Sequence, residues 1–166
     1  MLLPSGIKTK SDFLSFSATH QLFSSSKYGR TLSEKIRFEY YKPPYVEFDK
    51  WIEYLGYDVN NLHHLHVTYL ITRNFLRMSA EKSEHERFNE EEKGVLLFSA
   101  IVHDWGEAVM GDILLPIKNV PDEEREKIAL LQLFDELLQN RIPSRLREQT
   151  VEVIFGDKTV KLARAF

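Results

Sequence analysis

The sequence VLLFSAIVHD, residues 95–104, consists of eight apolar or small residues followed at once by a histidine and an aspartate. Asn89, with Glu92 three positions later, has the pattern of a capping box, which starts a helix. The run therefore predicts a deeply buried helix with His103 and Asp104 at its C-terminal end. Burying an imidazole beside a carboxylate is costly unless the two groups pair or bind a cation. The stretch thus predicts both the central helix of the fold and a polar site at its end.

Helical patterns flank this central helix on both sides. Asn60 or Asn61 can cap a helix that runs to about Met78. Further helices are predicted over 46–55, from 121 to about 139, from 143 to near 156, and over 157–166. The first thirty residues read as an irregular lead-in with room for one short helix. We find no internal repeat and no pair of strand patterns, so the sequence predicts an all-α, single-domain fold.

The composition is typical of one globular domain. The chain has 166 residues, of which 43% are hydrophobic and 28% charged, and a formal net charge of −3. This mild acidity argues against binding of duplex nucleic acid through a basic surface. No apolar run approaches the ~20 residues that span a bilayer, and the first residues do not form a secretion signal. We therefore expect a cytoplasmic protein without membrane contacts.

The absence of cysteine restricts the metal chemistry of the chain. With no thiolate, any metal must be held by histidine and carboxylate side chains. His103 and Asp104 cannot hold an ion alone, and a further ligand can come from His63, His64 or His66 at the start of another apolar helix. Taken without any resemblance, the His-Asp pair is more often a plain helix end with a neighbouring cap than a metal site.

The residues after the pair extend the pattern to His-Asp-x-x-Glu-x-x-x-Gly-Asp, followed by Pro-x-Lys. The matching positions are His103, Asp104, Glu107, Gly111, Asp112, Pro116 and Lys118. The pattern resembles that of the HD-domain metal-dependent phosphohydrolases, and within them the 5′-deoxynucleotidase-like branch. The resemblance covers about residues 60 to 166. We therefore divide the chain into an irregular, aromatic-rich lead-in packed on the core (1–55) and an HD-like helical domain (56–166).

The resemblance implies a divalent metal ion held by His63, His103 and Asp104. We choose His63 as the first ligand because the family reads His-x-x-x-Val there, and His63 precedes Val67 by four residues. The carboxylates of Glu107 and Asp112 are implied to act in catalysis beside the metal, where they position the attacking water or hold the sugar and phosphate. Lys118 is implied to neutralise phosphate charge in the substrate site.

The same resemblance implies the class of ligand. The substrate would be a small-molecule phosphomonoester, most simply a nucleoside or deoxynucleoside 5′-monophosphate, and a homodimer is compatible with the family. Histidine and carboxylate ligands suit Mn, Co, Fe, Ni, Mg or Zn to different degrees.

One position departs from the family pattern. The fourth metal ligand of the family is an aspartate after Val-Lys-x-(Ala or Leu), and here residues 160–163 fit this setting but Arg164 follows. A guanidinium cannot ligate a cation and repels it. Asp157 lies seven residues earlier and would share a face with residue 164 on a continuous helix, displaced by two turns or roughly 10 Å. We name Asp157 as the substitute ligand, with Glu107, Asp112 or water as the alternatives.

Three functions remain open from these residues. The first, which we expect, is an active metal-dependent phosphohydrolase with a rearranged fourth ligand. The second is a nucleotide-binding module in which Arg164 contacts phosphate directly, and the third is a helical partner-binding domain.

Overall fold

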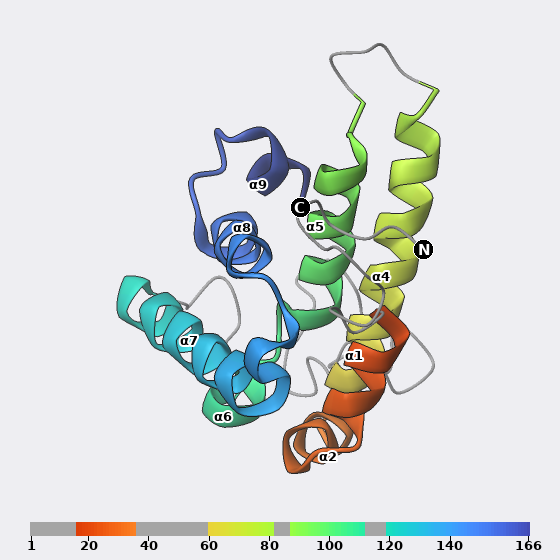
Figure 1. Cartoon of the computed structure of the whole chain (residues 1–166). Coiled ribbons are helices and arrows are strands. Elements are labelled where there is room, and N and C mark those ends of the chain that lie inside the picture. Colours follow the sequence, from red (N-terminus) through yellow and green to blue (C-terminus); the bar gives the residue numbers. More distant parts are fainter. Residues whose placement is uncertain (1–15, 36–59, 82–86, 112–118) are drawn as a thin grey trace, which may run out of the picture.

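The computed structural model describes residues 16–35, 60–81, 87–111 and 119–166, and the regular structure in these ranges is helical (Figure 1). The helices are α1 (Phe16–Ser24), α2 (Lys27–Ser33), α4 (Asn61–Ser79), α5 (Glu90–Val102), α6 (Glu107–Met110), α7 (Val120–Leu133), α8 (Ser144–Phe155) and α9 (Lys161–Ala165). The prediction of an all-α fold is confirmed. The predicted helix over 46–55 lies outside the described residues. None of the described helices combines the length and the apolar character that crossing a membrane requires.

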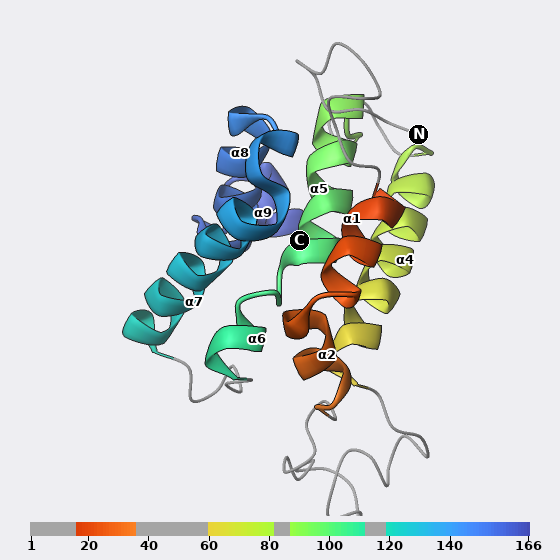
Figure 2. The same ribbon diagram turned by 60° about the horizontal axis from the view of Figure 1, so that its bottom comes forward.

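Helices α4 and α5 lie side by side and antiparallel (Figures 1 and 2). Asn60 caps α4 by accepting a hydrogen bond from the His63 backbone N–H at 2.7 Å. The predicted capping box of Asn89 and Glu92 is present at the start of α5. Every residue of α5 from Gly94 to Val102 is buried, because the described part of the fold covers this helix on several sides. The central helix therefore lies where its apolar sequence predicts it.

Two helices occupy the described part of the predicted irregular lead-in, which is more regular structure than the sequence indicated. Ser26 caps α2, and Gly29 allows α2 to fold back closely on α1, because a Cβ there would lie 2.3 Å from the Phe23 carbonyl oxygen. Phe23 is fully buried, and its ring stacks on that of Trp105 with the centroids 4.4 Å apart. The segment that contains α1 and α2 thus contributes directly to the core beside Asp104.

The C-terminal helices cover the other side of α5. Asn119 and Asp122 form a second capping box at the start of α7. The predicted single helix over 121–139 is interrupted, because α7 ends at Leu133 and continues as a π-helical turn, Phe134–Leu138, and a 3-10 turn, Gln139–Arg141. Helix α8 has the predicted bounds, and the last helix, α9, is shorter than predicted.

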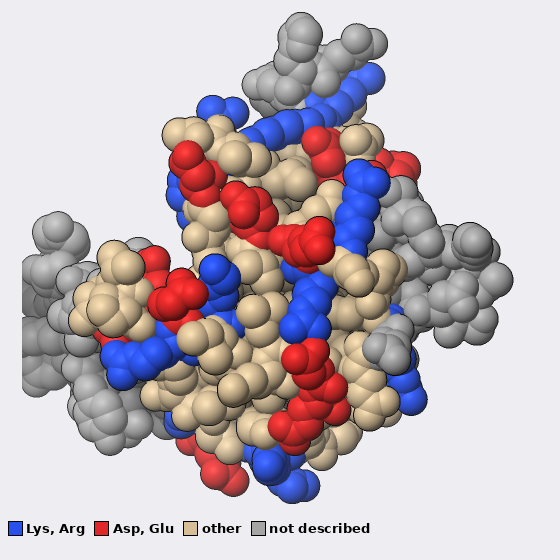
Figure 3. Space-filling view, turned by 60° about the vertical axis from the view of Figure 1, so that its left-hand side comes forward, with Lys and Arg blue, Asp and Glu red and all other residues tan. Residues whose placement is uncertain are grey.

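Basic and acidic side chains lie interspersed on the face shown in Figure 3. Ion pairs on the described surface join Arg125 to Asp122, Arg147 to Asp135, Arg145 to Glu91 and Lys161 to Glu92. Such pairs contribute little to stability individually.

Candidate metal centre

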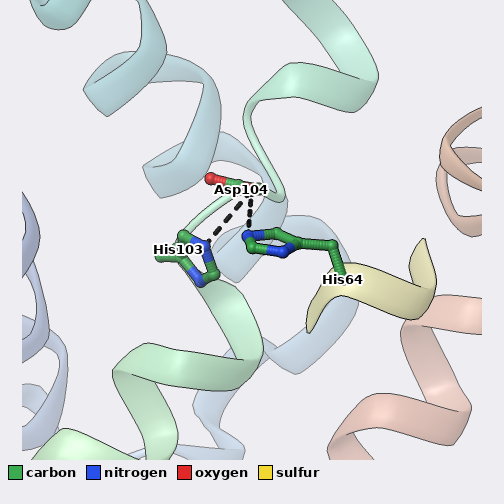
Figure 4. A group of neighbouring side chains, drawn as sticks. All are labelled: His64, His103 and Asp104. Atoms are coloured by element: carbon green, nitrogen blue, oxygen red, sulfur yellow. Dashed lines mark ion pairs between the residues drawn. The ribbon is translucent and has the colours of Figure 1, made fainter. Parts of the chain in front are cut away.

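His64, His103 and Asp104 meet where the start of α4 lies beside the end of α5 (Figure 4). Nε2 of His103 lies 3.2 Å from Oδ2 of Asp104, and Nε2 of His64 lies 3.5 Å from the same oxygen. The His103 and Asp104 side chains are largely buried, with 14% and 10% exposed, and that of His64 is 25% exposed. Three potential ligand atoms from two helix ends therefore share one partly enclosed position.

The hydrogen bond made by Nδ1 of His103 determines which ring nitrogen carries the hydrogen. Nδ1 lies 3.0 Å from the carbonyl oxygen of Ala100, and because a carbonyl can only accept, Nδ1 donates this bond. Nε2 then directs a lone pair at the Asp104 carboxylate unless it carries a second proton. A cation between the two groups removes this repulsion. A backbone carbonyl that holds the far nitrogen is also the usual support of a metal-ligating histidine.

The structure brings His64, and not His63, to His103 and Asp104. His63 is exposed on α4, and its ring neighbours that of His66 at 6.5 Å between centroids. His64 and His103 are 5.4 Å apart by the same measure, in an edge-on arrangement. His64, rather than the predicted first ligand His63, therefore lies beside the pair. The physical reason is that one residue along a helix turns a side chain by about 100°.

A second group of acidic side chains adjoins the first and shares Asp104 with it. One carboxylate oxygen from each of Asp104, Glu107 and Glu126 lies within 4.8 Å of the other two, and the three residues are buried. Glu107 accepts a hydrogen bond of 3.3 Å from the side-chain amide of Asn61. Asn61 lies one turn before His64 on α4. The same face of α4 therefore contacts Glu107 through Asn61 and Asp104 through His64. Glu107, expected from the sequence to flank the metal, thus lies next to Asp104.

Glu126 is a site residue that the sequence reasoning missed. It reaches the centre because α7 passes close to the turn after Asp104, where a Cβ on Gly106 would lie 2.8 Å from the Glu126 carbonyl oxygen. The buried residues of α7 are Asp122, Glu126, Ala129, Leu130 and Leu133. Glu126 therefore occupies a core position of an amphipathic helix. An acidic residue at an otherwise apolar position of the helical pattern is the sequence signal that could have identified it.

A pocket of about 570 Å³ opens beside the centre. The charged or polar side chains along it are His103, Asp104, Glu123, Glu126, Lys158 and Arg164, and Phe155 and Phe166 add aromatic surface. The Phe166 ring lies edge-on to that of His103, with 5.5 Å between centroids. Arg164, which stands where the family pattern has its fourth ligand, thus lines the same pocket as the His-Asp pair.

Asp157 does not join the ligand groups formed by the described residues. It lies in the turn before α9, is exposed, and accepts the backbone N–H of Thr159 at 2.8 Å. This hydrogen bond from the Thr159 backbone lowers the pKa of the Asp157 carboxyl. Its proposed position on one continuous helix with Arg164 is wrong, because α9 begins only at Lys161. Asp112 and Lys118 lie outside the described residues.

The donor set fits a divalent transition metal. Ligand atoms about 2.1 Å from a tetrahedral ion are about 3.4 Å apart, and Oδ2 of Asp104 lies 3.2 Å from Nε2 of His103 and 3.5 Å from Nε2 of His64. Two imidazoles and a carboxylate suit Mn, Fe, Co, Ni or Zn, whereas Mg prefers oxygen ligands. Comparisons of the chain with protein-family models, with curated proteins and with solved structures find no match.

Proposed function

We propose that this chain is a metal-dependent phosphohydrolase that acts on a phosphomonoester, most simply a nucleoside or deoxynucleoside 5′-monophosphate. The observation that carries the proposal is the spacing of His64, His103 and Asp104 around one position, next to an open pocket that His103 and Asp104 line. The sequence pattern from His103 to Lys118 supplies the reaction class. The homodimer and the cytoplasmic location expected from the sequence remain predictions within this proposal.

In this proposal, each residue of the site has a separate role. His64, His103 and Asp104 would hold the metal, which when bound supplies Lewis-acid polarisation of the phosphoryl group and activation of water. The Ala100 carbonyl holds the His103 ring in place through Nδ1. The Asn61 amide orients Glu107, whose carboxylate can accept a proton from the attacking water. Asp112 keeps the catalytic role beside the metal, and Lys118 the phosphate-neutralising role, that the resemblance implies.

The first experiment measures metal retention by the purified full chain after exposure to Mn²⁺ or Co²⁺ and removal of loose ions. We expect about one ion per chain in the wild type, a stoichiometry that three protein ligands can support. His64→Ala should lose the ion, whereas His63→Ala is the matched control, one residue along the same helix, and should retain it. Equal retention in both variants, or loss only in His63→Ala, would overturn the assignment of the site.

Catalysis is then tested with phosphomonoesters, including nucleoside and deoxynucleoside 5′-monophosphates. We expect phosphate release that requires the metal and disappears in His64→Ala and His103→Ala. A chain that retains one ion but releases phosphate from no member of the panel would overturn the reaction class and leave the metal site standing.

A second candidate function is a nucleotide-binding module without hydrolysis. It is favoured by the presence of Arg164 in the pocket beside Asp104, because a fixed positive charge weakens binding of a divalent cation. Nucleotide binding that is unchanged by a chelator, in a chain that retains no ion, would favour this candidate over the enzyme.

A further inference from the structure

We propose that Arg164 is the residue that binds the phosphate group of the substrate, which makes it a specificity-determining residue for phosphomonoesters. The inference rests on the proposed function and adds to it the group that recognises the substrate. In the family pattern, the residue at this position is an aspartate that binds the metal. In this chain the residue is an arginine, which would bind the substrate instead.

The first observation is that the Arg164 side chain has no ion-pair or hydrogen-bond partner among the described residues. The neighbouring basic side chains of the C-terminal helices are engaged: Arg145 pairs with Glu91 at 2.8 Å, and Lys161 pairs with Glu92 at 3.0 Å. Arg164 is exposed and lines the pocket together with His103 and Asp104. An unengaged guanidinium in a pocket is a ready donor for an anionic ligand.

The second observation is that the fold fixes the backbone that carries Arg164. Its backbone N–H donates to the Val160 carbonyl at 2.9 Å, and Ala163, the residue before it, is buried against the core. Two residues later, Phe166 packs edge-on against His103. These contacts hold the Arg164 backbone at the wall of the pocket that His103 and Asp104 also line, so the long side chain can adjust to a ligand there.

The third observation is the distribution of charge along the pocket. The described residues that line the pocket include the carboxylates of Asp104, Glu123 and Glu126 and two cationic side chains, Lys158 and Arg164. The Lys158 ammonium donates to the carbonyls of Val153 and Ile154 at 3.2 and 3.4 Å, so part of its donor capacity is used at the end of α8. Arg164 is thus the cation of this pair with its full set of donors available.

This arrangement matches a metal-bound phosphomonoester better than other ligands. The carboxylates repel an anion unless a cation accompanies it, and a phosphomonoester offers oxygens to both a cation and a guanidinium. Arginine donates two parallel hydrogen bonds to a dianionic phosphate, a geometry that an ammonium cannot reproduce. A phosphodiester has one negative charge and fewer free oxygens, so it accepts the two parallel hydrogen bonds of the guanidinium less well.

The test uses the full chain loaded with Mn²⁺ and inorganic phosphate as the probe, measured by calorimetry. We expect Arg164→Gln to weaken phosphate binding by about 10- to 100-fold, the loss of charge-assisted hydrogen bonds, with the Mn²⁺ stoichiometry unchanged. Arg164→Lys should fall between the wild type and Arg164→Gln. Arg145→Gln removes an exposed arginine outside the pocket and should bind phosphate like the wild type.

Three results would overturn the inference: no phosphate binding by the wild type, equal binding by wild type and Arg164→Gln, or the same loss in Arg145→Gln. Failure of the proposed function gives a different result. If the wild type retains no metal, the enzyme proposal fails by itself, and the same phosphate titration without metal still decides whether Arg164 binds phosphate. If Arg164→Gln does not fold, as judged by circular dichroism, the comparison is made with Arg164→Lys, which must then bind phosphate measurably more weakly than the wild type.

Discussion

Replacing Phe23 by alanine tests whether the N-terminal helices belong to the same cooperative unit as the candidate metal centre. Phe23 is fully buried, and its ring is nearly parallel to that of Trp105, with 7° between the planes and 4.4 Å between the centroids. Trp105 follows Asp104 directly, so α1 supports the turn that carries the candidate ligand. The side chain therefore links a helix near the start of the chain to the centre of the fold.

The magnitude follows from burial and from the ring pair. A fully buried Phe→Ala change costs about 3–5 kcal/mol, which includes the cavity left behind, and the stacked pair is worth ~0.5–1.5 kcal/mol beyond its buried area. In a chain of this size each kcal/mol lowers Tm by roughly 2–4 °C. We therefore expect Phe23→Ala to unfold roughly 6–20 °C below the wild type. Mn²⁺ binding at 25 °C should weaken as well, because the turn at Asp104 loses its support.

The assay is thermal unfolding followed by far-ultraviolet circular dichroism, in the presence of a chelator so that metal does not contribute. Phe75→Ala is the control, since Phe75 is 42% exposed on α4, and we expect it to cost ~1 kcal/mol, or roughly 2–4 °C. A Tm for Phe23→Ala within about 3 °C of the wild type would refute the reasoning. So would equal effects of the two substitutions.

Three further predictions concern the site and its surroundings. Gly106→Ala should destabilise the fold by about 1–3 kcal/mol, measured by urea unfolding, because its Cβ would lie 2.8 Å from the Glu126 carbonyl oxygen; an unchanged midpoint would contradict the close approach of α7. Arg164→Asp should lower the Kd for Mn²⁺ about tenfold or more, measured by electron paramagnetic resonance of the free ion, because it replaces a repelling charge with a ligand; unchanged or weaker binding would place residue 164 away from the metal. Burial, together with the nearby His66, lowers the pKa of His20 below 6.5. As the pH falls through 6.5, the unfolded chain therefore binds more protons at His20 than the folded chain does. The free energy of unfolding then decreases, so stability that is present above pH 6.5 is lost below it. The fall in Tm between pH 7.5 and 5.5 should therefore be smaller in His20→Gln than in the wild type, and an equal fall would show that His20 is not the titrating group.

Much of the helical framework was predictable because its signals are local. Asn60 and Asn89 cap the helices that they were expected to cap, and the apolar run after Glu92 forms the buried helix that ends at His103. A capping box satisfies backbone donors within four residues of the chain, so no distant contact is needed to decide it.

The predictions that failed depended on how helices approach one another. Helix α2 was missed because Gly29 acts through a close approach to the Phe23 carbonyl, which the local sequence does not reveal. The π-helical turn after Leu133 likewise interrupts a pattern that reads as one continuous helix. Asp157 was expected on one helix with Arg164, but the chain turns between them.

The choice among His63, His64 and His66 shows what the sequence can decide and what requires the tertiary structure. At 100° per residue, His63 points about 160° away from the buried Leu65, so the sequence alone could exclude it. His64 and His66 each lie about 100° from Leu65, on opposite sides, and the helix by itself cannot rank them. Packing decides: one side of α4 faces the end of α5, where His64 meets Asp104, and the other faces α1, where His66 neighbours His20. The sequence determined a His-Asp pair at the end of a buried helix, with Glu107 and Arg164 expected nearby, and only the packing of helices far apart in the chain decided that His64 and Glu126 lie beside it.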